Sequence, residues 1–510
     1  QPREPMIQID RHAPGSLVEN LKGEILRRIR LGLLRPGDRL PPTRRLAGEL
    51  GVHRGTVTAA YEALREDGVL TGHVGRGTFV AMGLALADLG PARRENGEFR
   101  WQDHFAGFDP PVEDGVVSEA AVIAAGREVI SFAGGVPDPA LFPTDSFRQA
   151  VDAVLRDEGS ALLGYGPPEG QASFVRFLRG YLGERGGLRL GDDELLVVNG
   201  SQQALDLIAR AFLRPGDTVL VEEPSYYGAL ELFRGYGARL VGVPVDSEGL
   251  RVDALEMILA RERPKLLYVM PTFQNPTGSC LSAERRPALV RLSARYEVPL
   301  VEDDFDGELY FGAPPPAPLK SLSDAQGVLY IGTPSKMLFP GLRIGWIAAA
   351  EPVIRRLSRI RRMADLSGSS LLQAALARFA ESGALTRHTE LVRDAYGRRV
   401  LRLLEALERH MPPGVSWTRP QGGLSLLLSL PEGLDAAALL PEAARAGVLY
   451  SPGRLFFVND GARHLRLSFG NVATDKVEEG AKRLGGVLRR EIAREKKAPR
   501  RARGEAFPPV

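Results

Sequence analysis

Apolar residues in the first seventy positions recur every three or four places, which is the spacing of one face of an amphipathic helix. A first helix is predicted from about residue 14 to the Pro36-Gly37 pair, which ends it. Two shorter helices are predicted over about Thr43–Leu50 and Arg54–Glu66. The residues expected to face inward from the first and third helices are Leu21, Ile25, Leu26, Ile29 and Leu33, and Val57, Ala60, Tyr61 and Leu64.

The pattern then changes from a helical to an alternating one. Residues 69–71 and 78–80 are short β-prone runs on either side of a glycine-rich turn, and they predict a hairpin. Two helices joined at Gly51 and followed by a hairpin are typical of a winged helix-turn-helix. We therefore expect an α+β winged-helix domain over residues 1–82.

The remainder of the chain has a different organisation. Residues 83–128 are rich in Gly, Pro and charge without periodicity, and we interpret them as a linker. From 129 to 488 short apolar strands alternate with helices, which predicts an α/β domain with a mostly parallel sheet covered on both faces, plus a smaller C-terminal α+β part at about 395–488. Residues 489–510 are basic and are expected to form a disordered tail. The predicted strands are Leu195–Asn199, Val219–Glu222, Leu266–Met270, Leu300–Asp303 and Leu329–Gly332.

Charge is divided unevenly along the chain. The 510 residues carry a net charge of +3, but residues 1–82 hold 13 Lys and Arg against 9 Asp and Glu, and residues 489–510 hold 8 against 3. The ends are thus +4 and +5, and the middle is −6. A basic end favours a polyanionic partner for that end alone.

Several classes of protein are excluded by composition. Cys280 is the only cysteine, so neither an internal disulfide nor a thiolate zinc site is expected, and the histidine spacing offers no helical metal-binding pair. No apolar run is long enough to span a membrane, and no signal pattern is present. We expect a cytoplasmic protein without a bound metal.

The N-terminal pattern suits DNA. Threonine hydroxyls, arginine and free helix amides at the start of the third helix can contact phosphates and base edges in a major groove. The stretches Leu34–Ala47 and Leu50–Val57 closely resemble the winged helix of the GntR family of bacterial repressors. The resemblance implies that the DNA contacts come from Arg44, His53, Arg54, Thr56, Gly75 and Gly77. The family usually has serine at position 53, where histidine is expected to be a poorer helix cap.

Three distant segments of the α/β domain suggest one cofactor site. Asn199–Gln203 lies at a strand-to-helix turn, where hydroxyl and amide groups favour an anion. Asp303 ends a strand, where a carboxylate can hold a protonated ring nitrogen. Lys336 follows a strand end and could form a Schiff base, and Arg343 could pair with a phosphate. Together these groups describe a site for pyridoxal 5′-phosphate.

The order and spacing of these segments resemble fold-type I aminotransferases over about residues 129–488. The resemblance implies that Lys336 forms the internal aldimine and that Asp303 holds the ring nitrogen. It also implies that Tyr226 stacks on the ring, that Asn275 contacts the ring hydroxyl, and that Arg466 clamps a substrate or effector carboxylate. The residues implied to hold the phosphate are Ser201, Gln202, Ser335 and Arg343, with Tyr165 from the neighbouring subunit.

One position departs from this pattern. Relatives place a tyrosine a few residues after the aspartate, where this chain has Phe305 and Asp306. Loss of that hydroxyl should shift the pKa of the imine and weaken transamination without preventing cofactor binding.

The whole chain resembles the MocR/GabR subfamily of GntR-type regulators. That resemblance implies a homodimer, with the winged helix of one subunit near the large domain of the other, that binds operator DNA and senses an amino compound by aldimine exchange at Lys336. Two alternatives stay open. One is a catalytically competent aminotransferase with an incidental DNA-binding domain, and the other is a regulator that senses pyridoxal phosphate itself.

Overall fold

The computed structural model describes residues 7, 16–30, 33–73, 77–82, 123–124, 126 and 128–497. The chain divides into two compact units, Gln1–Phe108 and Asp109–Val510. The predicted linker at 83–128 lies almost entirely outside the described residues, so its boundaries stay predictions.

The first unit is a three-helix domain with a two-stranded wing. It contains α1 (Leu17–Arg30), α2 (Thr43–Leu50), α3 (Arg54–Glu66), β1 (Leu70–His73) and β2 (Gly77–Val80). The strands pair antiparallel, with Leu70 opposite Val80, as the alternating pattern predicted. One inward prediction is wrong: Leu33 is 55% exposed, because α1 ends at Arg30 and helical spacing no longer applies, and Leu34 is buried instead.

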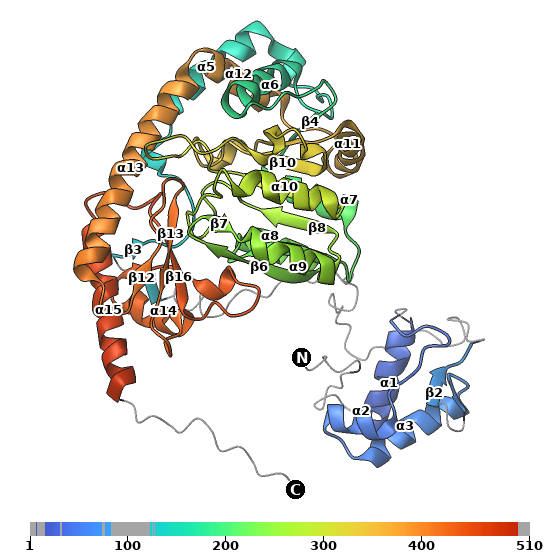
Figure 1. The fold of residues 1–510 in the computed structure, drawn as a ribbon. Helices are drawn as coiled ribbons and strands as arrows, with labels where there is room; N and C mark the ends of the chain where they lie inside the picture. The colour runs from blue at the N-terminus through green and yellow to red at the C-terminus, as the bar shows by residue number, and fades with distance from the viewer. Residues whose placement is uncertain are drawn as a thin grey trace. The chain divides into compact units, whose positions relative to one another are not determined.

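The second unit is built on an eight-stranded, mostly parallel sheet (Figure 1), in the order β4-β11-β10-β9-β8-β5-β6-β7. All five predicted strands are present. The sheet also contains β6, β7 and β11, which were not predicted, and β11 runs antiparallel between β4 and β10. The strands are β4 (Leu195–Val198), β5 (Thr218–Glu223), β6 (Arg239–Asp246), β7 (Gly249–Leu250), β8 (Leu266–Val269), β9 (Leu300–Asp304), β10 (Val328–Gly332) and β11 (Gly345–Ala348).

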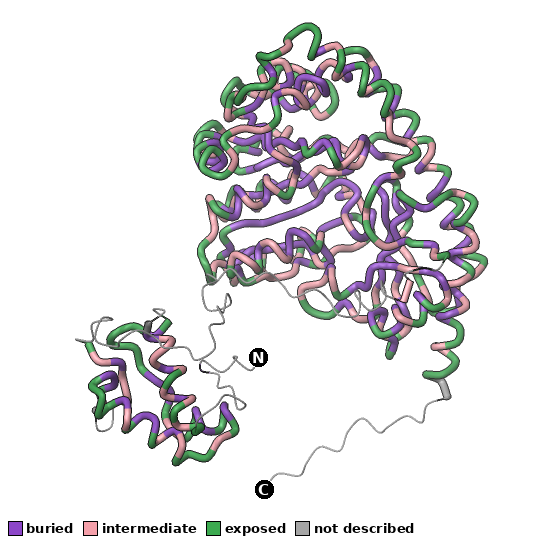
Figure 2. Tube along the Cα trace, turned by 180° about the vertical axis from the view of Figure 1, so that it is seen from behind, coloured by how far each residue is buried: buried purple, intermediate pink, exposed green. Residues whose placement is uncertain are grey.

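Helices cover both faces of this sheet, and the strands are correspondingly buried on both sides (Figure 2). Val219 and Val221 of β5 pack in the same apolar cluster as α7, α8 and α11, whereas Leu220 between them packs with α9 and α10. The helices of the large unit before the C-terminal part are α5 (Thr144–Asp157), α6 (Ala172–Gly186), α7 (Ser201–Phe212), α8 (Tyr227–Gly235), α9 (Val252–Glu262), α10 (Arg285–Arg295), α11 (Glu351–Asp365) and α12 (Ser370–Glu381).

The C-terminal part is an α+β layer that begins with the long helix α13 (Ala384–His410). Its four-stranded sheet has the order β12-β13-β16-β15, and β14 pairs in parallel with β3 from the start of the unit. The elements are β3 (Ile130–Ser131), β12 (Ser416–Trp417), β13 (Ser425–Ser429), α14 (Ala436–Arg445), β14 (Val448–Leu449), β15 (Ser451–Pro452), β16 (His464–Ser468) and α15 (Val477–Lys497).

The predicted start of the tail at Arg489 is wrong for residues 489–497, because α15 continues to Lys497. Ile492 packs against the main apolar cluster and Arg494 pairs with Glu491 one turn earlier, so helical spacing persists within the basic run. None of the helices in the described ranges is long and apolar enough to cross a membrane.

Candidate functional site

The predicted cofactor residues meet at the carboxyl edge of the large sheet. Gly332, the last residue of β10, lies beside Asp304 at the end of β9, and the loop after β4 leads directly into α7. Ligands of α/β sheets commonly bind at this edge. One cavity is lined by Ser201, Gln202, Tyr226, Asn275, Asp303, Ser335, Lys336, Arg343 and Arg466. Tyr165 does not line it and is 90% exposed.

An anion site is formed where α7 begins. Gly200 precedes the helix with φ +86°, and no side chain caps the first turn, so its amide groups stay available to a ligand. Arg343 donates to the carbonyl of Asn199 (3.0 Å), and a Cβ at position 200 would lie 2.9 Å from its Nη2. Glycine is therefore required where the guanidinium crosses the backbone. A cationic group beside free amides suits a phosphate.

Asp303 presents one free oxygen to the cavity. Its carboxylate is 2% exposed, and Tyr268 donates to Oδ2 at 2.8 Å, while Oδ1 has no partner among the described residues. Burial raises the pKa of Asp303 to about 7. A buried acceptor without a donor fits a protonated ring nitrogen. Tyr268 was missed from the sequence because it lies inside the apolar run of β8.

Lys336 lies opposite a second buried carboxyl group. Its Nζ donates to the carbonyl of Gly135 at 2.5 Å, and burial lowers its pKa, which the charges of Asp306 and Asp303 partly oppose. Asp306 is 4% exposed, and its Oδ1 has no partner within the described ranges. Burial raises the pKa of Asp306 to about 7. At this wall of the cavity Phe305 therefore offers no hydroxyl, and Asp306 offers an acid.

Arg466 is a buried cation without a carboxylate partner in the described part of the chain. It donates to Gly134 O (2.5 Å), Ser451 Oγ (3.1 Å) and Asn275 Oδ1 (3.2 Å), and it lies 4.7 Å from the centre of the Phe456 ring. Burial lowers its pKa to about 10. These contacts orient the guanidinium, whose uncompensated charge suits an anionic group on a ligand.

Aromatic rings form one wall. Tyr226 precedes α8 and its ring passes over Gly228, where a side chain would collide with it. Tyr227 also lines the cavity, with its ring edge-on to Phe456 at 5.9 Å, although the sequence analysis did not single it out. Nothing in the motif around Tyr226 indicated that the neighbouring Tyr227 would also line the cavity.

The predicted DNA contacts lie on α2, α3 and the wing. Arg44 and Arg54 are exposed and Thr56 is half-buried. Gly77 has φ +112°, and a Cβ there would lie 2.9 Å from Arg39 Nε. Gly75 lies outside the described residues.

His53 is a functioning helix cap. Its Nδ1 accepts a hydrogen bond from the amide of Gly55 at 3.1 Å, the second residue of α3. An imidazole nitrogen therefore caps α3, and that it does so less well than serine stays a prediction.

Both halves of the chain match known families. Residues 17–80 match the bacterial regulatory proteins of the gntR family, and residues 128–484 match the class I and II aminotransferases. The fold and site thus define an aminotransferase-like domain preceded by a gntR-type DNA-binding domain. The large unit therefore belongs to the class I and II aminotransferase family, and the chain as a whole belongs to the MocR-type transcriptional regulators, which combine it with a gntR-type domain.

Individual relatives represent both architectures. The chain is 31% identical to the probable rhizopine catabolism regulatory protein MocR of Rhizobium meliloti, over 94% of this chain and 95% of that protein. It is 37% identical to aromatic-amino-acid aminotransferase 1 of Thermococcus litoralis, over 74% of this chain and 92% of the relative. The structure of LysN, the α-aminoadipate aminotransferase of Thermus thermophilus complexed with N-(5′-phosphopyridoxyl)-L-leucine, matches with a TM-score of 0.72 and 36% identity. That match covers 78% of this chain and all of LysN.

Proposed function

We propose that this regulator binds pyridoxal 5′-phosphate in the cavity of Lys336 and controls operator binding in response to an amino compound. The observation that carries the proposal is the convergence of Lys336, the free Oδ1 of Asp303 and the anion site of Arg343 in one cavity. A chain that has both a DNA-binding domain and such a cavity can couple ligand binding in the cavity to DNA binding.

The cofactor would be held at three points. Arg343, Ser335 and the first turn of α7 would bind the phosphate, Asp303 Oδ1 the ring nitrogen, and Tyr226 the face of the ring. When bound, the cofactor supplies a carbonyl carbon to which an amine can attach, and a ring that withdraws electrons from it.

The chain's own residues would then manage the incoming amine. An effector with a carboxylate would bind Arg466, which lacks a carboxylate partner in the described part of the chain. An amine arrives protonated and must lose a proton before it can take the place of Lys336. Asp306, with a pKa of about 7 beside Lys336, is suited to accept that proton at Oδ1.

Signal transfer requires that the effector binds two states of the protein with different affinity. We propose a homodimer, with the winged helix near the partner's large domain, because two recognition helices contact two half-sites of an operator. The 90% exposure of Tyr165 supports the proposal, since an exposed tyrosine is free to contact a partner subunit.

A second candidate function is transamination. It is favoured by the presence of the lysine, the aspartate and the carboxylate-binding arginine in one cavity. Phe305 offers no hydroxyl to the ring, so we expect slow turnover at most. Incubation of the full chain with amino acid and keto acid pairs distinguishes a regulator, which releases no new amino acid, from an enzyme.

The first test is Lys336→Ala, with Lys476→Ala as control, because Lys476 is exposed and pairs with Glu128 far from the cavity. After incubation with pyridoxal 5′-phosphate and reduction with borohydride, mass spectrometry should find the cofactor on the peptide containing Lys336 in the wild type and in Lys476→Ala. In Lys336→Ala the adduct and the absorbance band should both be lost. An unchanged band in Lys336→Ala would overturn the assignment.

A further inference from the structure

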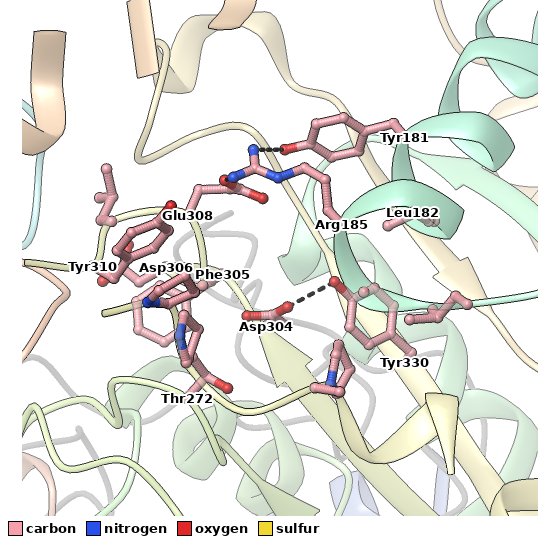
Figure 3. A pocket seen from close by; sticks show the side chains of 18 of the residues that line it. Tyr181, Leu182, Arg185, Thr272, Asp304, Phe305, Asp306, Glu308, Tyr310 and Tyr330 are labelled. Atoms are coloured by element: carbon pink, nitrogen blue, oxygen red, sulfur yellow. Dashed lines mark hydrogen bonds and ion pairs between the residues drawn. The ribbon is translucent and has the colours of Figure 1, made fainter. Parts of the chain in front are cut away.

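A second cavity, of about 320 Å³, is lined in part by the segment that follows Asp303 (Figure 3). Its lining includes Asp304, Tyr330 and Trp346 from the sheet, Arg185 from α6, and the proline-rich run 314–318. It shares only Phe305, Asp306 and Thr333 with the cofactor cavity. Its volume is at the lower end of the ~300–1,000 Å³ typical of small-molecule sites.

The inner part of this cavity holds a buried acid, Asp304. Tyr330 donates to Asp304 Oδ2 at 2.7 Å, and Figure 3 shows this pair in the interior of the cavity. Oδ1 has no hydrogen bond of good geometry, although the backbone of Gly307 passes beside it, and Asp304 forms no ion pair with any described residue. Burial raises the pKa of Asp304, and the hydrogen bond from Tyr330 and the charges of Arg286 and Arg185 oppose this rise only in part.

A donor is also left unused there. Trp346 is 5% exposed, and its indole Nε1 has no acceptor among the described residues. Buried indole groups usually have a partner. An orphaned donor and an orphaned carboxylate oxygen in one cavity indicate a ligand with both a cationic donor and an acceptor.

The other end of the cavity is lined by the cation of Arg185. Arg185 and Arg393 both pair with the single carboxylate of Glu308, Arg393 at 2.7 Å. Arg185 also donates to Tyr181 OH at 3.1 Å, and its side chain is 31% exposed. Two guanidinium groups thus share the carboxylate of Glu308, and the charge of Arg185 also acts on Asp304.

We propose that this cavity is a second effector site, for a small zwitterionic amino acid whose ammonium group binds Asp304 and whose carboxylate binds Arg185. The cavity presents Asp304 to the ammonium group and Arg185 to the carboxylate, so each charged group of the ligand would meet an opposite charge. The site shares a wall with the cofactor cavity, and Asp306 is the only binding group of that cavity that also lines this one. The second-site proposal therefore does not depend on the cofactor proposal.

The test uses calorimetric titration of the full chain, loaded with pyridoxal 5′-phosphate, with N,N-dimethylglycine. This probe is zwitterionic, and as a tertiary amine it cannot condense with a carbonyl. We expect binding by the wild type and none of acetate, which lacks the ammonium. Asp304→Asn and Arg185→Gln should each weaken binding at least about tenfold, as expected for loss of a charge-assisted hydrogen bond.

Two further variants separate this site from the cofactor cavity. Trp346→Phe, which removes the indole donor but keeps an aromatic ring, should also weaken binding. Arg466→Gln, in the cofactor cavity, should leave it unchanged. Absence of binding by the wild type, binding unaffected by both Asp304→Asn and Arg185→Gln, or binding lost in Arg466→Gln would overturn the proposal.

Discussion

Asp306 determines the charge balance around Lys336. Its folded pKa of about 7 is well above the ordinary value near 4, chiefly because of burial. Between about pH 4 and pH 7 the folded chain therefore keeps a proton that the unfolded chain has released. Asp306 therefore contributes a fall in the free energy of unfolding of the cofactor-free protein as pH rises through this window.

The residue-level prediction is that Asp306→Asn makes this dependence shallower. Asparagine keeps the shape but does not titrate, and one pKa unit corresponds to about 1.4 kcal/mol. The loss of unfolding free energy between about pH 5 and about pH 7 should be smaller by more than about 1 kcal/mol, measured by urea unfolding at each pH. Asp192→Asn, at an exposed site, is the control. Equal slopes in wild type and Asp306→Asn would contradict the buried-acid interpretation.

At the scale of elements, α3 depends on its cap. His53→Ala removes the acceptor of the Gly55 amide and should destabilise the winged helix by about 1 kcal/mol, whereas His53→Ser should restore most of this. Arg54→Ala, at an exposed position, should leave the stability unchanged and weaken operator binding. Thermal unfolding and fluorescence anisotropy with operator DNA measure the two effects. Unchanged thermal stability in His53→Ala would contradict the capping role, and normal DNA binding by Arg54→Ala would contradict the DNA-contact role.

The sequence predicted the elements whose signal is local. Apolar runs gave the five central strands, and three-to-four spacing gave the three helices of the winged helix. Long-range pairings were not predictable in this way. β11 enters between β4 and β10, and Tyr268 meets Asp303, 35 residues later, only because β8 and β9 lie side by side. Likewise the extension of α15 depends on packing of Ile492 that charge composition did not reveal.

At the scale of the whole molecule, the proposed dimer predicts a dependence between subunits. We expect sedimentation velocity to give twice the chain mass of 55.4 kDa. Tyr165→Ala should lower the affinity for pyridoxal 5′-phosphate although Tyr165 does not line the cavity of its own chain. Tyr227→Ala serves as the comparison, because Tyr227 does line the cavity of its own chain. A monomer that binds the cofactor with full affinity would contradict the shared site.

The charge distribution gains a physical meaning at this scale. The +4 of residues 1–82 belongs to the domain that matches gntR-type regulators, whereas the acidic middle of the chain binds its proposed phosphate through a local site at Arg343 and α7. Net charge therefore indicates a DNA-binding domain only when it is counted for each domain separately.

The most direct test of the account measures operator affinity and cofactor absorbance in the same samples. Each compound of a panel of amino compounds is added to the full chain loaded with pyridoxal 5′-phosphate. The absorbance of the cofactor and the Kd for a DNA fragment from upstream of the gene are then measured. We predict that a compound that shifts the absorbance also changes the Kd for DNA, and that Lys336→Ala shows neither effect. A shift in absorbance with no change in Kd, for every compound, would contradict the coupling of cofactor site and DNA binding.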